Sequence, residues 1–538
     1  MKQTLCSGRR IMVLDCTLRD GGFVNEWKFG HECIINIAGR LDRANMDIIE
    51  VGYLRNTAIY NEDSTEFPDT LSINKSIGGH HYNAMIVAIM DYGKCDIERV
   101  APKESSIVDG IRLTFRKNEI NEALELAVKI KGLGYKVFLQ PVAITDYSAS
   151  DVVAFVEKAN SVQPFAVCMV DTYGFMSKRD LIRYFYLFDA SLDDGICLGY
   201  HSHNNFQLSY SNSIELIEQI SNRELIIDST VFGMGKGAGN LNTEMITSYI
   251  NNNIVEKYDV GQVLEIISLY IDEQKKLHSW GYDLRYFLSA STDTHHQYAN
   301  YLIEKKTLSI DSITTILKRI KDDKRTRYDE EYIESLYAEY QNVEINDTEA
   351  MDGIREFIGN RKILLLAPGS SIRNERERIK RYMERENPVV IGINNLFRDF
   401  KPDILFISNA LRYGQIEDEI SQYNMQDIKV IATSNISVVS LIPEWCVNYK
   451  NLLVTDELEI SDNSALMFLN LLVRLGVGCV SLAGLDGYGS NSNYYKQGIA
   501  LREDLSKKTD IIKRALHSIK NKIDLQFITK SMYEEGTT

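Results

Sequence analysis

Short apolar segments recur between Ile11 and Gly233, and stretches with the apolar periodicity of amphipathic helices separate them. The apolar segments are rich in β-branched residues and show no polar alternation, which is typical of strands buried on both faces of a parallel sheet. They begin at Ile11, Asp47, Ala84, Gly110, Lys136, Phe165, Cys197 and Leu225. This pattern predicts a (β/α)₈ TIM barrel, a fold of about 250 residues.

The pattern changes twice after the barrel. Apolar residues at helical spacing predict several helices from Val260 to about Tyr340, and a second alternation of apolar segments and helical stretches begins at Lys362. The expected strands of this second part begin at Lys362, Pro388, Asp403, Lys429, Asn451 and Cys479. We therefore expect four parts: a barrel over residues 1–255, a helical appendage over 256–345, a linker over 346–360 and an open Rossmann-like α/β domain over 361–538.

Composition and charge narrow the class of protein. The 538 residues are 44% hydrophobic and 25% charged, which excludes a disordered chain or a fibrous rod. The net charge of -15 opposes binding to nucleic acid or to an anionic membrane, and we expect neither partner. No apolar run is long enough to span a bilayer, and the start of the chain lacks an apolar signal segment. We expect a cytoplasmic homo-oligomer whose 8 dispersed cysteines are reduced.

Polar residues collect at the carboxyl ends of the predicted barrel strands. They are Arg19, Asp20, Glu50, Arg112, Thr114, Gln140, Asp171, Thr172, His201 and His203. Buried strands have no structural need for so many ionisable groups in one layer, because each one costs desolvation energy unless it is paired or bound to metal. The carboxyl ends of the strands form the catalytic face of a barrel. We therefore expect the active site there.

Three of these residues predict a metal site. Asp20 ends the first strand, and His201 and His203 end the seventh, so barrel closure brings them to the same mouth. Period two in a strand points both imidazoles to one side. A carboxylate with imidazoles and water suits a divalent ion, and we expect Mn²⁺ first, with Mg²⁺, Co²⁺ or Zn²⁺ as alternatives.

Three motifs around these residues resemble the DRE-TIM metallolyase superfamily, and most closely the 4-hydroxy-2-oxovalerate aldolases. They are LDCTLRDGG from Leu14, GYHSHNN from Gly199 and GMGKGAGN from Gly233, and the resemblance covers about residues 1–340. It implies that Asp20, His201 and His203 bind the metal and that Asn240 occupies a position that ligates it in the lyase branch. It also implies that Arg19 stabilises the enolate of pyruvate.

The resemblance breaks at Phe23, where the aldolases carry a catalytic histidine. Another residue must then act as the base, and His31, Glu50 and Tyr286 are the candidates. Arg19, Thr172 and Gln140 are the expected substrate contacts. We expect an aldolase or lyase that acts on a 2-oxo acid and an aldehyde. The alternatives are an acyl-CoA condensing or cleaving enzyme of the isopropylmalate synthase or hydroxymethylglutaryl-CoA lyase type, and a barrel that only binds a ligand.

The C-terminal part offers a weaker candidate site. Its segment LLLAPGSSI, from Leu364, places Gly369, Ser370 and Ser371 between a strand and a helical stretch, where backbone N–H groups can meet a phosphate. A simple capped turn explains the same residues equally well. Asp403, Asn409 and Asp486 are further candidates for ligand contact. This part weakly resembles Rossmann-like domains beside bacterial glycan-biosynthesis enzymes, which implies a nucleotide or nucleotide-sugar ligand and a role in surface-carbohydrate synthesis.

Overall fold

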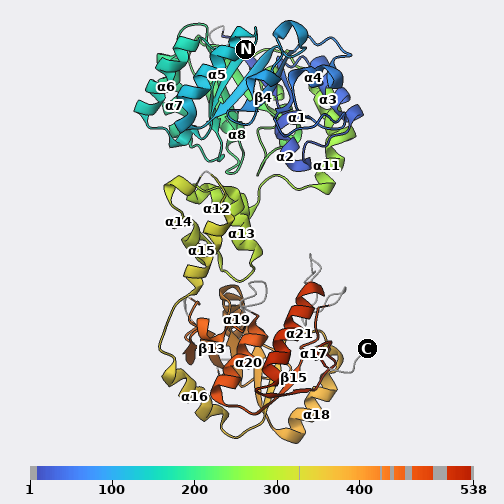
Figure 1. Ribbon diagram of the computed structural model, residues 1–538, viewed down its shortest axis with the longest axis vertical. Helices are drawn as coiled ribbons and strands as arrows, with labels where there is room; N and C mark the ends of the chain where they lie inside the picture. The colour runs from blue at the N-terminus through green and yellow to red at the C-terminus, as the bar shows by residue number, and fades with distance from the viewer. Residues whose placement is uncertain are drawn as a thin grey trace. The chain divides into compact units, whose positions relative to one another are not determined.

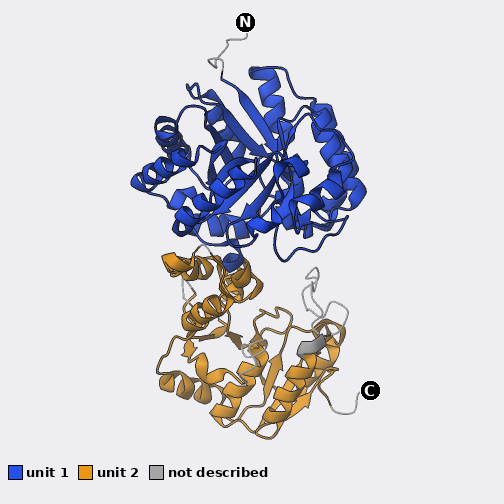
Figure 2. Cartoon of the chain, turned by 45° about the horizontal axis from the view of Figure 1, so that its top comes forward, with its two compact units in different colours: residues 1–299 blue, residues 300–538 orange. Residues whose placement is uncertain are grey.

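The computed structural model describes residues 9–325, 327–423, 427–436, 441–454, 463–488 and 506–534. The chain folds into two compact units, residues 1–299 and 300–538 (Figure 2). Among the described helices, none is long and apolar enough to cross a membrane. The seven cysteines in the described residues are all free thiols, in agreement with the dispersed spacing.

Unit 1 contains the predicted barrel (Figure 1). Eight parallel strands form a closed sheet because β1 pairs with both β2 and β9. A short strand, β3 (Glu66–Phe67), adds to β2 outside the barrel. All eight predicted apolar segments are strands: β1 Ile11–Asp15, β2 Ile48–Leu54, β4 Met85–Asp91, β5 Gly110–Phe115, β6 Lys136–Pro141, β7 Ala166–Asp171, β8 Cys197–Ser202 and β9 Leu225–Ser229. The TIM-barrel prediction is confirmed.

Both faces of the barrel sheet are buried, which explains the continuous apolar runs. Met12 and Leu14 of β1 belong to the cluster inside the barrel, whereas Ile11 and Val13 pack in the layer between strands and helices. The covering helices are α3 His31–Arg43, α4 Thr70–Ile77, α5 Ile120–Gly132, α6 Ala149–Val162, α7 Lys178–Ser191, α8 Ser209–Glu218 and α9 Thr243–Asn253. Two short helices, α1 (Thr17–Asp20) and α2 (Gly22–Asn25), follow β1 and carry the first motif.

The segment after the barrel is helical, as its periodicity predicts. Its helices are α10 Val260–Ile266, α11 Asp272–Leu277, α12 Leu284–Thr292, α13 His296–Glu304, α14 Ile310–Lys318 and α15 Glu330–Gln341, with a π-helical turn at Ile267–Ile271 between α10 and α11. The boundary between the compact units falls inside α13. The expected appendage, residues 256–345, is therefore shared between the two units.

The segment expected as a linker, residues 346–360, is mostly a helix of unit 2. Helix α16 spans Thr348–Ile358, and Met351, Ile354 and Ile358 lie in the hydrophobic core of that unit. The acidic residues around this helix suggested a solvated connection, but three apolar residues at spacings of three and four form a buried stripe.

Unit 2 contains a parallel sheet of seven strands in the order β14-β13-β12-β11-β10-β15-β16. The strands are β10 Ile363–Leu366, β11 Val389–Ile393, β12 Ile404–Ile407, β13 Lys429–Thr433, β14 Trp445–Val447, β15 Cys479–Ala483 and β16 Asp524–Phe527. Helices α16, α20 (Ser464–Leu475) and α21 (Ser506–Lys520) pack in one core. Helices α17 (Ser371–Asn374), α18 (Arg376–Glu386) and α19 (Ala410–Tyr423) contribute to two other clusters. The predicted α/β class is confirmed.

One expected strand of unit 2 is wrong. Asn451 and Leu452 of this segment lie in a short 3₁₀ helix, Lys450–Leu452, and none of its described residues, 451–454, belongs to the sheet. Its run of three apolar residues is as compatible with a buried turn as with a strand, and periodicity cannot distinguish the two. The edge strands β14 and β16 are less buried than the central strands. Their sequences carry no strong apolar pattern.

Candidate active site

Asp20, His201 and His203 meet at the barrel mouth as predicted. One ligand atom from each residue lies within 4.8 Å of those of the other two, and all three side chains are buried. His201 is in β8, and the rings of His201 and His203 lie 5.3 Å apart at 90°. Asp20 is in the short helix α1, one turn beyond the end of β1 where it was expected. The extra turn brings its carboxylate inward over the strand ends.

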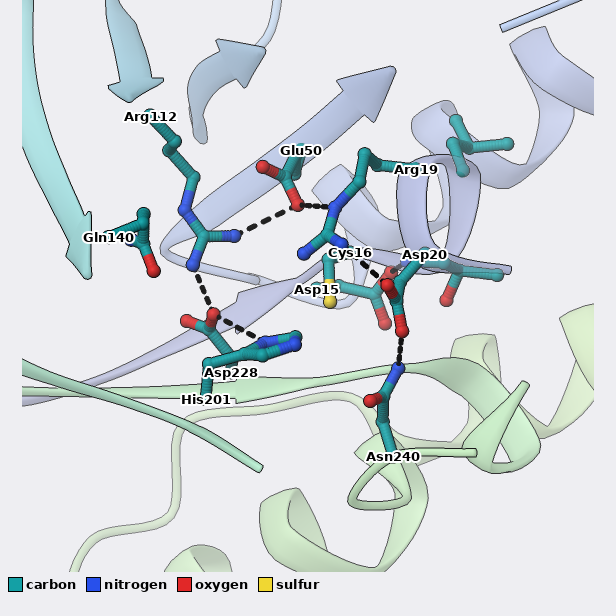
Figure 3. A network of polar contacts seen from close by, with 12 residues as sticks. Asp15, Cys16, Arg19, Asp20, Glu50, Arg112, Gln140, His201, Asp228 and Asn240 are labelled. Carbon is teal, nitrogen blue, oxygen red and sulfur yellow. Dashed lines mark hydrogen bonds and ion pairs between the residues drawn. The ribbon is translucent and has the colours of Figure 1, made fainter. Parts of the chain in front are cut away.

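An ionic network connects two of these residues through the barrel interior (Figure 3). Arg19 Nη1 donates to Asp20 Oδ1 at 2.5 Å, and Arg19 Nε donates to Glu50 Oε2 at 2.7 Å. Arg112 Nη1 donates to the same Glu50 oxygen at 2.9 Å. Glu50 is thus held between two guanidinium groups.

The network continues from Arg112 to His201. Arg112 Nη2 donates to Asp228 Oδ2, and the same carboxylate oxygen lies 2.9 Å from His201 Nδ1. This contact leaves His201 Nε2 as the nitrogen directed to a metal, because one ring nitrogen is used by the carboxylate. Asp228 was missed from the sequence, although a charged residue inside the apolar strand LIIDS was a signal.

The charges of the network shift the pKa values of its members. Burial would raise the pKa of Asp20, but Arg19 and the two histidines hold it well below its usual range. Burial would likewise raise the pKa of Asp228, and Arg112 and His201 lower it. Burial lowers the pKa of His203 to about 4. The site therefore presents ionised carboxylates and a neutral His203 imidazole at neutral pH, the states in which these groups bind metal.

The donor atoms at this site fit a divalent ion. Two buried atoms, Asn240 Oδ1 and His203 Nδ1, have no hydrogen-bond partner in the described part of the chain. Asn240 Nδ2 donates to Asp20 Oδ2, so the amide lies directly against the carboxylate. Buried polar atoms without partners are costly, and a bound cation would use the free oxygen. Asp20, His201 and His203 can hold the ion, with Asn240 beside them.

The glycine-rich motif supplies space for this arrangement. A Cβ atom on Gly235 would lie 2.4 Å from Asn240 Nδ2 and 2.7 Å from Asp20 Oδ2. A Cβ atom on Gly239, whose φ is +82°, would lie 2.0 Å from the Gly233 carbonyl oxygen. The glycines are required for close approach of the backbone to the metal ligands.

The three candidates for the base differ in position. Glu50 has one oxygen, Oε2, between two arginines, whereas its Oε1 is buried without a hydrogen-bond partner among the described residues, so a role as base stays a prediction. The backbone of His31, at the start of α3, donates to Asp63 Oδ1, and no described contact joins His31 to the network. Tyr286, on α12, lies near the glycine-rich motif, since a Cβ on Gly237 would be 3.6 Å from its ring. Burial raises the Tyr286 pKa.

A small cavity of about 30 Å³ lies beside the triad, and the sequence analysis missed three of its lining residues, Lys236, His295 and His296. The other lining residues are Thr172, Tyr173, His203, Asn205, Gly237 and Ser289. Burial lowers the pKa of His295 to about 3 and that of His296 to about 2, so both imidazoles are neutral. The only available signal was the adjacent histidine pair in a helical segment, which no motif connects to the barrel.

The expected substrate contacts lie in different surroundings. Thr172 lines the small cavity, and its Oγ1 accepts from the Ala143 backbone N–H at 2.8 Å. Gln140 is buried, and with its amide oxygen turned toward Arg112 it accepts from Nε and Nη2 at 3.1 Å each. Phe23 is 40% exposed, and its ring packs edge-on against Trp27 with centroids 4.8 Å apart. A substrate role for Thr172 or Gln140 stays a prediction.

In unit 2, the Gly-Ser-Ser turn after β10 holds a carboxylate of the chain itself. Ser371 N donates to Asp486 Oδ2 at 2.8 Å, and the hydroxyl groups of Ser370 and Ser371 also donate to this carboxylate. Gly369 allows the approach, since a Cβ there would lie 2.5 Å from Asp486 Cγ. The donors expected to bind phosphate are thus in use, which favours the capped-turn alternative. Asp403 accepts from the Val390 N–H at 2.8 Å and has a structural role at the other end of the strands.

Comparisons with known proteins concern mainly the barrel. Residues 10–269 match the HMGL-like family. The chain is 24% identical over 247 residues to oxaloacetate decarboxylase of Mycobacterium tuberculosis, a match that covers 45% of this chain and 70% of that protein. It is 24% identical over 277 residues to 4-hydroxy-2-oxovalerate aldolase of Pseudoalteromonas translucida, covering 50% and 78%. A solved HMG-CoA lyase of Bacillus subtilis aligns with a TM-score of 0.41 at 13% identity, covering 50% of this chain and 95% of that one.

Proposed function

Residues 10–269 form an HMGL-like domain, and from this premise we propose that unit 1 is a divalent-metal-dependent lyase or aldolase that acts on a 2-oxo acid through the enolate of pyruvate. The observation that carries the proposal is the buried triad of Asp20, His201 and His203 with Arg19 beside it. Loss of carbon dioxide from oxaloacetate and cleavage of 4-hydroxy-2-oxovalerate, the reactions in the names of the two relatives, both leave pyruvate as its enolate.

The triad would hold the ion, which supplies a Lewis acid for the carboxylate and keto oxygens of the 2-oxo acid. We propose Mn²⁺, because oxygen and imidazole ligands without thiolate suit it, and Mg²⁺, Co²⁺ and Zn²⁺ are the alternatives for the test. The residues around the triad fit an anionic substrate. Three carboxylates and two guanidinium groups form the network, which therefore has a net charge of −1. A bound divalent cation would change this net charge to +1.

Arg19 is placed to stabilise the negative charge that develops on the keto oxygen. Its Nε and Nη1 are fixed by Glu50 and Asp20, and its Nη2 makes no hydrogen bond within the described residues. The two ion pairs orient the guanidinium before the substrate arrives, which lowers the cost of reorganisation during the reaction. The free nitrogen is the donor available to the substrate.

The proton transfers need a group other than Phe23. We assign them to His296 with His295, because both line the cavity that contains His203. In the cleavage of a 4-hydroxy-2-oxo acid, the base removes the hydroxyl proton while the bond between C3 and C4 breaks. The products are an aldehyde and the enolate, which takes up a proton at its methylene carbon. Tyr286, whose ring centroid lies 5.9 Å from that of His296, can assist the transfer.

Exchange of the methyl protons of pyruvate with deuterated solvent tests enolate formation without knowledge of the second substrate. Proton NMR of the full-length protein should show exchange with Mn²⁺, removed by a chelator. A coupled assay for released pyruvate should then be run with oxaloacetate, 4-hydroxy-2-oxovalerate and sugar-derived 4-hydroxy-2-oxo acids. Absence of both exchange and pyruvate release in metal-loaded protein would contradict the proposal and favour the acyl-CoA chemistry of the lyase and synthase branches.

Arg19→Lys separates the roles of charge and geometry in this mechanism. Lysine keeps the charge but loses the planar group that bridges Asp20 and Glu50. We expect turnover to fall by about 10²–10³-fold while the metal stays bound, because the stabilisation is needed only as charge develops. Normal turnover in this variant would show that Arg19 is structural. A place for the reaction in surface-carbohydrate synthesis stays a prediction from the resemblance of residues 361–538.

A further inference from the structure

A cavity of about 250 Å³ lies in unit 2 at the carboxyl ends of the central strands. The segments that follow β10, β11, β12 and β15 line it, together with the start of α20. From β10 the chain proceeds to β11, β12, β13 and β14 on one side, and β15 and β16 lie on the other side of β10. The direction of the sheet order therefore changes between β10 and β15. Open parallel sheets bind ligands at such a reversal.

Amide and hydroxyl groups dominate the polar part of the lining. The residues are Asn394, Asn395, Asn409, Asn463 and Ser464. Several are fixed by the fold: Asn394 Nδ2 donates to Ser464 Oγ at 2.6 Å, and Asn463 Oδ1 accepts from Leu466 N at the start of α20. Rigid groups of this kind exchange hydrogen bonds with ligand hydroxyls at small entropic cost.

Asn395 is the residue that points most directly to a ligand. Only 7% of its surface is exposed, and its side-chain amide has no hydrogen-bond partner among the residues that the structure describes. The Asn394 amide, one residue earlier, is satisfied by Ser464 and lies 3.4 Å from the backbone nitrogen of Ser408. An amide that lines the cavity and has no partner among the described residues is available to donate hydrogen bonds to a ligand and to accept them from it.

Arg412 gives the cavity its cation. It is the one arginine or lysine in the lining that the structure describes, and its Nη1 donates to the neutral Gln415 side chain at 2.8 Å. No carboxylate pairs with Arg412 among the described residues. A half-buried guanidinium with a neutral partner is available to a ligand carboxylate or phosphate.

Asp486 contributes a fixed acceptor that also lines the cavity. The serine turn holds its carboxylate, so the side chain cannot turn away when a ligand enters. A carboxylate in this place accepts hydrogen bonds from hydroxyl groups and repels a phosphate at the turn. The anionic group of a ligand must then lie toward Arg412, and its hydroxyl groups toward Asp486.

We propose that this cavity binds a monosaccharide-sized anion, either a sugar acid or a sugar phosphate. The volume of about 250 Å³ is slightly below the range of about 300 to 1,000 Å³ that is typical of small-molecule sites, and it suits one sugar ring better than a nucleotide sugar. Arg412 recognises the anionic group, and Asn395 and Asp486 recognise hydroxyl groups. The inference rests on unit 2 alone and is independent of the reaction proposed for unit 1.

The test is a binding screen with the full-length protein by thermal shift, followed by titration calorimetry. One arm contains gluconate, glucuronate, galacturonate and mannonate, and the other contains the 1- and 6-phosphates of glucose, galactose and mannose. Neutral sugars, acetate, inorganic phosphate, CMP and UMP are the comparisons. We expect at least one sugar anion to bind 10-fold or more tightly than its neutral sugar and than acetate or phosphate alone. The arm that contains it identifies the anionic group.

Variants locate the binding. Arg412→Gln should weaken binding of the sugar anion at least 10-fold without lowering the unfolding temperature, and Arg381→Gln, on α18 outside the lining, should leave it unchanged. Asn395→Ala should weaken the charged and neutral sugars alike. Asp20→Asn should have no effect, which separates this cavity from the barrel mouth. Three results would overturn the proposal: no sugar anion binds, binding is unaffected by Arg412→Gln, or a mononucleotide binds while the sugar anions do not.

Discussion

Both units place polar side chains at the carboxyl ends of parallel strands, but they use opposite chemistry there. The barrel mouth of unit 1 gathers ionised groups. Among them, Arg19 pairs with Asp20 and Glu50, and all three side chains are buried. The carboxyl ends of the central strands of unit 2 gather mostly neutral amides and hydroxyls, with one cation, Arg412, and one carboxylate, Asp486. A closed barrel can pair buried charges from several strands around one axis, whereas an open sheet exposes its crevice to solvent. The difference indicates a reactive centre in unit 1 and a recognition site in unit 2.

The largest expected effect is loss of metal from unit 1 alone. Asp20→Asn or His203→Ala should reduce metal affinity and turnover by at least about 10³-fold, because a three-residue ligand set loses one member. Asp486→Asn makes the same chemical change in unit 2 and should leave metal content unchanged. Metal analysis after dialysis measures both. Retention of full metal occupancy at unchanged affinity in the unit 1 variants would reject the triad.

The buried ion pairs should also differ from exposed ones in their effect on stability. Glu50→Gln leaves Arg19 and Arg112 without their shared carboxylate, and we expect a loss of about 3–5 kcal/mol. Glu386 in unit 2 also pairs with two cations, Lys362 and Arg385, but on the surface. Glu386→Gln should cost much less stability than Glu50→Gln, because solvent screens its ion pairs. Denaturant unfolding of both variants measures this, and equal losses would contradict the contrast.

Asp228→Asn tests whether the network orients a metal ligand. Asparagine keeps the shape of the side chain but loses the charge that fixes His201 through Nδ1. We expect metal affinity to fall about 10–100-fold, as is typical for partners of ligating histidines. Asp403→Asn removes a structural carboxylate in unit 2 and is the matched control. If the two variants bind metal equally well, the contact between Asp228 and His201 has no role in metal binding.

The smallest effect concerns pH. The pKa values of His295 and His296, about 3 and 2, lie below the ordinary value of 6.5 because both rings are buried. The unfolded chain protonates these two histidines below about pH 6.5 while the folded unit does not, so their contribution to the stability of unit 1 should fall as the pH drops from 7 toward 4. The slope should be on the order of 1 kcal/mol per pH unit for each histidine.

Hydrogen exchange by mass spectrometry can follow this effect in each unit separately. Peptides from residues 9–299 are compared between pH 6.5 and 4 in the wild-type protein and in His296→Gln, after correction for intrinsic exchange rates and with unit 2 peptides as the internal reference. The variant should lose less protection over this range than the wild-type protein, because it lacks one imidazole that takes up a proton only on unfolding. A pH dependence that is unchanged in this variant would show that the ring is protonated in the folded protein.

Sequence reasoning was most successful where local pattern and topology agree. The apolar segments of the barrel are buried on both faces, so their composition alone predicts strands, and the periodicity of His201 and His203 predicts a shared orientation. It failed at Asn451, where a short apolar run forms a turn, and at residues 346–360, where α16 replaces the expected linker. Short runs lack the length that separates one secondary structure from another.

The sequence by itself determined the eight-stranded barrel, the α/β class of the second unit, and the meeting of Asp20 with His201 and His203, because strand order in a barrel follows from the chain. The tertiary structure alone decided how the charges are paired. Only the fold places Glu50 between two arginines, sets Asp228 against His201, and fills the Gly-Ser-Ser turn with Asp486. These contacts join residues that lie far apart along the chain, and their partners depend on side-chain positions within a few ångströms, which no local pattern specifies.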